Sequence, residues 1–272
     1  MRGSTPCNGE DIRRYGGNTS SVSIDAPGQD PLLFDLGTGV RYFGLSQPTD
    51  RPFRGTCLLS HVHWDHVQGL PFFSPLLQQG AELDVYAPSQ NGDCNVTDLM
   101  NETIRPPLFP ITLAELPGEI RFHEIADSEF GIGGFGVMSR LIPHIGRTCV
   151  YRVTWLGRSI SYLSDHQQPE NGSFSVTAGA LELCEGVDVM IHDAQYTPAE
   201  FKLKRDWGHC MIEYAIWLAA EARARTLVLF HHDPSHDDDC LDALAGAAAA
   251  CGRARGVEVL AAYEGLRLVV GG

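Results

Sequence analysis

Short apolar runs recur along this chain, and turn residues separate them. Runs of this length, either continuous or alternating with polar residues, predict β-strands. We therefore expect strands at 22–24, 31–34, 56–59, 83–86, 120–125, 135–141, 150–155, 159–163, 187–191, 226–230, 257–262 and 266–270. The first two are expected to form an opening hairpin, and Leu156-Gly157-Arg158 predicts a second hairpin between 150–155 and 159–163.

Apolar residues at helical spacing predict helices between many of these strands. They are expected at 67–79, 96–104, 176–184, 208–223 and 241–251. The segments 41–54 and 105–110 contain prolines and are expected to be loops, and Asn91-Gly92-Asp93 is expected to be a turn. Alternating strands and helices predict an α/β fold.

Polar residues that can bind metal follow the apolar strands. Those at or just past a strand end are His61, His63, His144, Asp165, Asp193 and His231. Open α/β folds build their sites at strand ends, so we expect these side chains to converge.

The densest group is Ser60-His61-Val62-His63-Trp64-Asp65-His66. Side chains alternate along an extended chain, so His61 and His63 point the same way and can hold one ion. Asp65 and His66 follow on the turn and can reach a second ion. Ordinary surface histidines are the alternative, but four potential ligand side chains within six residues disfavour it.

Composition narrows the class of protein. A chain of 272 residues with 43% hydrophobic content can bury a large core, and we favour a single domain over 1–272. The formal net charge of -14 disfavours nucleic acid and favours a small-molecule partner. Neither a membrane-spanning run nor a signal-peptide core is present, which predicts a cytoplasmic protein with no membrane partner. The eight cysteines form no C-x-x-C pair and are expected to be free thiols.

The H-x-H-x-D-H pattern of residues 61–66 resembles the signature of the metallo-β-lactamase superfamily. The chain also resembles the other motifs of that family, in the same order, at Phe34–Gly39, Pro143-His144 with Tyr151–Val153, Ser161–Asp165 and Leu227–His231. Two further stretches, Ile191–Tyr196 and Gly208-His209-Cys210, resemble the phosphodiesterase branch that holds ribonuclease Z and the cyclic phosphodiesterases. The resemblance implies a four-layer αββα sandwich.

The same resemblance implies two divalent metal ions and assigns their ligands. His61, His63 and His144 hold one ion, Asp65, His66 and His231 hold the other, and Asp165 bridges them. Imidazole and carboxylate ligands suit Zn²⁺, and Mn²⁺ or Fe²⁺ stay open. A hydroxide shared by the ions would attack the substrate. Asp35 is expected to orient a ligand without binding metal itself.

The expected catalytic residues are Asp65, His209 and Asp193. His209, in the first turn of the helix expected at 208–223, would give a proton to the leaving alkoxide while Asp193 orients its ring. The alternative is that His209 only begins a helix and Asp193 only ends a strand. The branch commonly carries a longer glutamate where this chain has Asp193, which leaves its reach to His209 open.

The remaining histidines are expected to be structural. They are His123, His166, His192, His232 and His236. His232 should face away from His231 on an extended backbone and should bind no metal.

These residues favour a dinuclear phosphodiesterase that acts on small esters such as cyclic nucleotides. Candidate phosphate contacts are Lys202, Lys204, Arg205 and Arg147. The alternatives are tRNA 3′-end processing, an acyl hydrolase of the lactonase or β-lactamase type, and a metal-binding scaffold without turnover. A homodimer stays open.

Overall fold

The computed structural model describes residues 1–90 and 94–271. The turn expected at 91–93 lies outside the described residues. The chain divides into two compact units. The inserted unit is Ser20–Ala126, and the discontinuous unit consists of Met1–Thr19 with Asp127–Gly272. The single domain expected over 1–272 stays a prediction.

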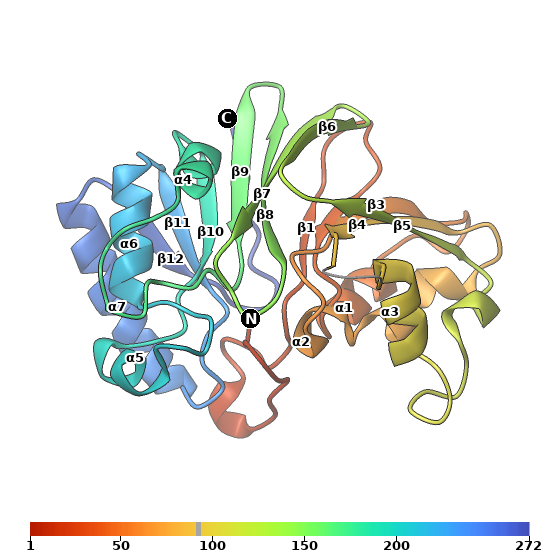
Figure 1. Ribbon diagram of the computed structural model, residues 1–272, viewed down its shortest axis with the longest axis horizontal. Coiled ribbons are helices and arrows are strands. Elements are labelled where there is room, and N and C mark those ends of the chain that lie inside the picture. Colours follow the sequence, from red (N-terminus) through yellow and green to blue (C-terminus); the bar gives the residue numbers. More distant parts are fainter. Residues whose placement is uncertain (91–93, 272) are drawn as a thin grey trace. The chain divides into compact units, whose positions relative to one another are not determined.

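The inserted unit is built on a five-stranded sheet of order β1-β2-β3-β4-β5 (Figure 1). Its strands are β1 (Val22–Ile24), β2 (Leu32–Phe34), β3 (Arg54–Leu58), β4 (Glu82–Pro88) and β5 (Glu119–Ile125). β1 and β2 form the expected antiparallel hairpin, and the other neighbours are parallel. Its helices are α1 (Val40–Leu45), α2 (Trp64–Val67) and α3 (Val96–Thr103), with 3₁₀ turns η2 (Leu70–Phe72), η3 (Ser74–Leu77) and η4 (Leu113–Glu115).

Alternation along the strands of this unit separates core from surface. In β4, Leu83, Val85 and Ala87 are fully buried, while the residues between them are partly exposed. The parallel strands β2 and β3 pair Phe34 with Leu58, so their carboxyl ends lie together. The residues that follow these two ends include Asp35 and the histidine motif.

The discontinuous unit holds a seven-stranded sheet of order β12-β11-β10-β9-β8-β7-β6. Its strands are β6 (Ser128–Ile132), β7 (Phe135–Ile142), β8 (Thr148–Trp155), β9 (Arg158–Leu163), β10 (Val189–Asp193), β11 (Thr226–Phe230) and β12 (Glu258–Ala261). β6 to β9 are antiparallel, and β9 to β12 are parallel. Its helices are α4 (Ala178–Cys184), α5 (Pro198–Lys204), α6 (Ile212–Glu221) and α7 (Asp238–Ala254), with the 3₁₀ turn η1 (Glu10–Ile12).

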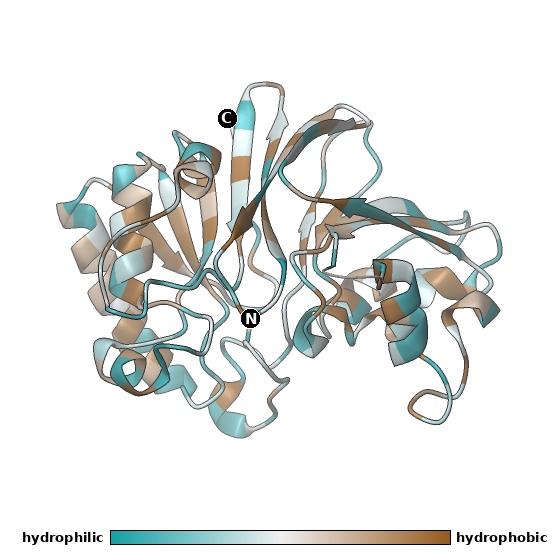
Figure 2. Cartoon of the chain, viewed as in Figure 1, coloured by the Kyte–Doolittle hydropathy of each residue, from teal (hydrophilic) through white to brown (hydrophobic). Residues whose placement is uncertain are grey.

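Helices pack on this sheet through apolar side chains. α4 contacts β7 and β8, α6 contacts β10 and β11, and α7 contacts β12. Figure 2 shows hydrophobic residues along β10 and β11, whose side chains belong to the core of this unit. The three parallel strands β9, β10 and β11 end at one edge of the sheet, so Asp165, Asp193 and His231 emerge close together.

Most expected strands are confirmed, but some elements differ from the expectations. The sequence interpretation missed β6, α5 and α1, the last of which overlaps the start of the loop expected at 41–54. Residues 266–270 are not a strand. The helix expected at 67–79 is wrong: α2 ends at Val67, and two 3₁₀ turns follow. Pro71 and Pro75 lack the backbone donor that a helix needs, and a side chain at Gly69 would come within 2.1 Å of the Gly37 carbonyl oxygen.

The helix expected at 208–223 begins later, at Ile212. Residues before it are extended, because Tyr196 donates its N–H to the Cys210 carbonyl at 3.1 Å and accepts the N–H of Ile212 at 3.0 Å. His209 therefore precedes the helix and does not lie in its first turn. No helix within the described residues has the length and hydropathy needed to cross a membrane.

Candidate metal centre

In the inserted unit, the histidine motif follows β3 and continues into α2. The ring of His61 lies 4.3 Å from the ring of His63 and 4.3 Å from that of His66, measured between centroids. His63 is the extended residue just before α2, and Asp65 and His66 are in its single turn. The His66 Nε2 atom lies 3.2 Å from a carboxylate oxygen of Asp65. The motif thus gathers three imidazoles and a carboxylate, as its spacing predicts.

Asp35 contacts this group and the backbone next to it. One of its oxygens accepts the backbone N–H of Ser60 at 2.7 Å, and the other lies 2.7 Å from Nδ1 of His66. The Ser60 hydroxyl in turn lies 3.0 Å from Nδ1 of His61. Asp35 is fully buried, and its contact with Nδ1 of His66 is the kind of contact expected of a group that orients a ligand.

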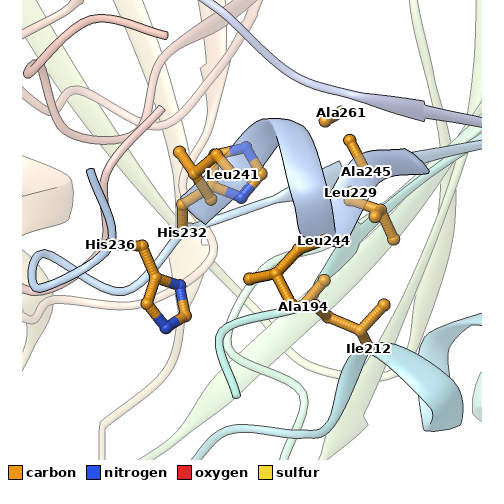
Figure 3. Close-up of a pocket in the computed structure, with 9 residues that line it drawn as sticks. All are labelled: Ala194, Ile212, Leu229, His232, His236, Leu241, Leu244, Ala245 and Ala261. Carbon is orange, nitrogen blue, oxygen red and sulfur yellow. The ribbon is translucent and has the colours of Figure 1, made fainter. Parts of the chain in front are cut away.

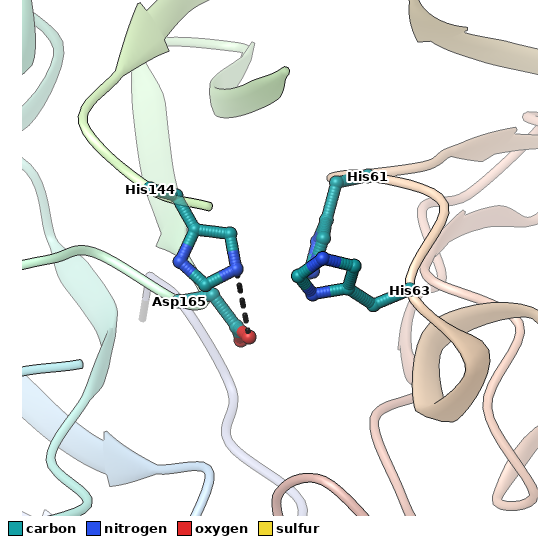
Figure 4. Close-up of side chains that lie close together, drawn as sticks. All are labelled: His61, His63, His144 and Asp165. Atoms are coloured by element: carbon teal, nitrogen blue, oxygen red, sulfur yellow. Dashed lines mark ion pairs between the residues drawn. The ribbon is translucent and has the colours of Figure 1, made fainter. Parts of the chain in front are cut away.

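In the discontinuous unit, Asp165 lies between two imidazoles. One carboxylate oxygen is 3.6 Å from Nε2 of His144, the pair joined by the dashed line in Figure 4, which also draws His61 and His63 of the inserted unit. The other oxygen is 3.2 Å from Nε2 of His231. Asp165 is 2% exposed, and the Ser164 hydroxyl donates to it at 2.7 Å. This placement offers one carboxylate oxygen toward each imidazole.

The two imidazoles beside Asp165 are also held through Nδ1. His144 donates Nδ1–H to the Gly208 carbonyl at 2.8 Å, and Nδ1 of His231 lies 2.8 Å from the side-chain oxygen of Gln195. A carbonyl oxygen only accepts, so these contacts place the proton on Nδ1 and leave the lone pair on Nε2. Metal-binding histidines in proteins are held in this manner.

The donor set fits a divalent transition metal ion. Four motif imidazoles have Nδ1 engaged by an oxygen, namely those of His61, His66, His144 and His231. Imidazole nitrogen and carboxylate oxygen suit Zn²⁺ and its neighbours, and a buried carboxylate is favoured by a nearby cation. Within the discontinuous unit alone, Asp165, Asp193, His209 and His231 place ligand atoms within 4.8 Å of one another.

His209 and Asp193 form a buried pair at the end of β10. Nδ1 of His209 lies 2.6 Å from a carboxylate oxygen of Asp193. The second oxygen accepts the backbone N–H of Gln195 at 3.1 Å and that of Cys210 at 3.4 Å. Asp193 is shorter than the glutamate expected from the resemblance, but its carboxylate still reaches the His209 ring. The His209 ring also stacks on that of His231, with centroids 5.0 Å apart.

Left-handed backbone recurs at these strand ends. Asp35 follows β2 with φ 58°, Asp165 follows β9 with φ 56°, and His231 follows β11 with φ 58°. Non-glycine residues rarely adopt this conformation, and its clustering at one kind of position is typical of functional sites.

The histidines expected to be structural have other partners. His232 donates Nε2–H to the Ala262 carbonyl at 3.0 Å, and His123 lies 2.7 Å from a carboxylate oxygen of Asp84. His166 and His192 contact each other at 2.9 Å between ring nitrogens. Burial lowers the pKa of His166, His192 and His232, so these rings stay neutral.

Three residues that hold the ligands had no assigned role in the sequence interpretation. They are Ser60, Gln195 and Gly208. Ser60 and Gln195 lie within two residues of His61 and Asp193, so adjacency was a usable signal. Gly208 acts through its carbonyl oxygen, and residue type carries no information about such a contact.

A small pocket lies elsewhere in the discontinuous unit, between α7 and the ends of β11 and β12 (Figure 3). Alanine and leucine side chains line most of it, together with His232 and His236. It contains none of the expected ligands or catalytic residues. Nε2 of His236 lies 2.7 Å from Glu200, and we assign this pocket no role in the reaction.

Comparisons with known proteins agree with this geometry. A family model described as a beta-lactamase superfamily domain matches residues 33–232. Ribonuclease Z from Pyrococcus abyssi is 25% identical over 259 residues, covering 80% of this chain and 82% of that protein. The metallo-beta-lactamase fold protein YhfI from Bacillus subtilis aligns with a TM-score of 0.70 at 18% identity, covering 97% of this chain and 94% of that one. A diphosphatase from the PhnP family aligns with a TM-score of 0.65 at 17% identity, covering 92% and 84%. The structural matches confirm the expected fold class.

We predict that Asp35→Asn weakens metal binding without unfolding the protein. Asparagine tolerates the left-handed backbone, but its amide donates toward Nδ1 of His66 where a carboxylate accepts, and loss of such an orienting partner typically costs roughly 10- to 100-fold in affinity. Competition of Zn²⁺ against a chromophoric chelator measures this, with the exposed Asp30→Asn as the matched control. Equal affinities for the Asp35 variant and the parent protein would contradict the assigned role.

Proposed function

This chain belongs to the metallo-β-lactamase superfamily and is a metal-dependent hydrolase, and on that premise we propose that it is a dinuclear phosphodiesterase for small phosphodiesters such as cyclic nucleotides. The observation that carries the proposal is the buried pair of His209 and Asp193 beside Asp165. A proton donor at this position serves a reaction that expels an alkoxide. The similarity to a ribonuclease and to a diphosphatase supports phosphoester chemistry.

We assign the ligands by the family pattern. One ion would be held by His61, His63 and His144 and the other by Asp65, His66 and His231, with Asp165 shared. Each set combines residues of the inserted unit with residues of the discontinuous unit, so their joint action is part of the proposal. Two bound divalent ions, most suitably Zn²⁺, would supply the nucleophile and neutralise charge on the phosphoryl oxygens.

Asp165 supports the shared role through its own geometry. Its two oxygens face different imidazoles, at 3.6 Å from His144 and 3.2 Å from His231. A carboxylate that bound one ion only would need one of these contacts and not both. Loss of Asp165 should therefore affect both ions.

His209 would act on the leaving group. When the phosphorus–oxygen bond breaks, the departing alkoxide takes the proton on Nε2 of His209, and water returns a proton to the ring afterwards. Asp193 accepts Nδ1–H at 2.6 Å, which keeps Nε2 directed outward and stabilises the protonated ring. The backbone donors from Gln195 and Cys210 hold the carboxylate in place.

The charged groups near α5 favour a compact substrate. Lys204, one candidate phosphate contact, is already paired with Asp233 at 2.7 Å and lies over the Tyr196 ring. Lys202 and Arg205 are exposed on α5 or directly after it. The formal net charge of -14 disfavours binding of a long polyanion.

Cleavage of RNA is the second candidate. The named activity of the Pyrococcus abyssi relative favours it and weakens the expectation that nucleic acid is not a partner. The acidic balance of this chain weighs against it. Hydrolysis of a lactone or β-lactam ranks lower. A lactone also expels an alkoxide, so the His209 and Asp193 pair does not exclude it, but the named activities of the relatives favour a phosphoester.

We predict about two transition metal ions per chain in protein purified without chelator, as a dinuclear site requires. Asp165→Ala should lose both ions, because the carboxylate is shared. His232→Ala should keep both, because its ring bonds to the Ala262 carbonyl instead. Elemental analysis checks all three proteins. Loss of an ion from the His232 variant, with full metal in a His231→Ala variant, would show that the wrong neighbour was chosen.

His209→Ala should keep both ions yet slow alkyl phosphodiester hydrolysis by roughly 10² to 10⁴, the usual contribution of a positioned acid. A p-nitrophenyl ester should suffer less, because its leaving group is stable as an anion. Asp193→Asn should show the same trend more mildly. The plot of log kcat against leaving-group pKa measures the effect.

The matched control for this series is His123→Ala on β5, which removes a histidine that lies 2.7 Å from an aspartate, close to the 2.6 Å between His209 and Asp193. Its leaving-group dependence should equal that of the parent protein. If His209→Ala slows both esters equally with metal retained, His209 binds the phosphate and is not the acid.

A further inference from the structure

The first residues of the chain pair with the segment that carries His231. Arg2 and His232 form a parallel β-bridge, in which the N–H of Gly3 donates to the His232 carbonyl at 2.9 Å and the N–H of His232 donates to the Met1 carbonyl at 3.0 Å. These partners are about 230 residues apart along the chain. His232, the second residue after β11, is thus fixed by a segment distant in sequence.

The Arg2 side chain stabilises this pairing. Its guanidinium is fully buried and donates to the carbonyls of Gly16 at 3.0 Å and His236 at 2.5 Å. It also lies 3.8 Å from Asp238 at the start of α7. A buried guanidinium held by several acceptors resists displacement, so the backbone of Gly3 has little freedom to move.

Gly3 lies directly against the ring of His231. A Cβ atom built on it would come within 2.4 Å of both Cε1 and Nδ1 of His231, and within 2.8 Å of the Gln195 side-chain oxygen. These are far shorter than van der Waals contact. The φ of Gly3 lies outside the left-handed region, so packing against the ring and not backbone freedom requires glycine here.

Gly208 has the same relation to a second imidazole. A Cβ there would lie 2.5 Å from Cε1 and Nδ1 of His144, whose Nδ1–H the Gly208 carbonyl accepts. Its φ of 91° also favours glycine, so this position cannot separate packing from backbone strain. Gly3 is therefore the position at which the contact itself can be tested.

We propose that Gly3 is a positioning residue for His231, so that the amino-terminal segment controls the affinity of the ion that His231 holds. The inference rests on the metal role proposed for His231. A methyl group at residue 3 must push the ring off Gln195 and move Nε2 away from Asp165. By the assignment above, the ion of His61, His63 and His144 shares Asp165 but not His231, so its binding should change little.

The test compares Gly3→Ala with Gly246→Ala, a position in α7 where an added Cβ meets nothing within 4 Å. Full-length apoprotein is titrated with Co²⁺, and the visible absorption spectrum reports each ion as it binds. Gly3→Ala should bind one ion as the parent does and the other at least about tenfold more weakly, the scale of losing an orienting contact. Gly246→Ala should match the parent for both. Parent-like binding of both ions by Gly3→Ala overturns the proposal.

A double-variant cycle keeps the test decisive if Gly3→Ala folds poorly. Melting temperatures are measured without metal for the parent, Gly3→Ala, His231→Ala and the double variant. Removal of the imidazole leaves room for the methyl group, so the double variant should have the same melting temperature as His231→Ala. Gly3→Ala alone should have a lower melting temperature than the parent. An equal loss in both backgrounds would contradict a contact through His231. This cycle needs no bound metal, so it stays informative if the parent protein binds no second ion and the proposed function itself fails.

Discussion

The site depends on imidazole rings that are held through Nδ1. A metal ion needs Nε2 fixed at about 2.0 to 2.1 Å, and a ring able to rotate or change tautomer would present the wrong nitrogen part of the time. Asp35, Gln195 and the Gly208 carbonyl remove that freedom for His66, His231 and His144. The packing of Gly3 against His231 extends the same constraint from hydrogen bonding to steric contact. The fold thus prepares the ligands independently in each unit.

Buried carboxylates and left-handed backbone are the features of this site that destabilise the folded protein. Asp35, Asp165 and Asp193 are almost fully buried, and an unpaired ion there would cost on the order of several kcal/mol. Asp35 and Asp193 are satisfied by backbone N–H groups and an imidazole each, whereas Asp165 lies between two imidazoles, where a cation would offset its charge. Left-handed backbone at Asp35 and Asp165 adds to the cost, and both residues lie where a strand ends and the side chain must turn toward the site.

Much of this could be predicted from the sequence because ligand types and apolar runs are local signals. The strand-end positions of Asp165, Asp193 and His231 followed from the pattern, and the fold class followed from the motifs that resemble the family. Local and non-local effects both explain the failures. The helix expected at 67–79 is broken by Pro71 and Pro75, a local signal that the sequence interpretation underweighted, and by the Gly69 N–H, which donates to the Leu36 carbonyl at 2.8 Å. The start of α6 is delayed by pairing of Cys210 with Tyr196. The roles of Gly3 and Gly208 could not be predicted, because a glycine next to a ring looks like any other glycine until the chain is folded.

A side-by-side activity panel distinguishes a metal-dependent phosphodiesterase from an acyl hydrolase of the same fold. Metal-reconstituted protein is assayed on a phosphodiester, a phosphomonoester, a lactone and a β-lactam, with chelated protein as the blank. The account predicts that kcat/KM is highest for the phosphodiester, by roughly 100-fold or more over the acyl substrates, and that chelation abolishes it. A lactone or β-lactam turned over faster than the phosphodiester by the same metal-loaded protein would contradict the account.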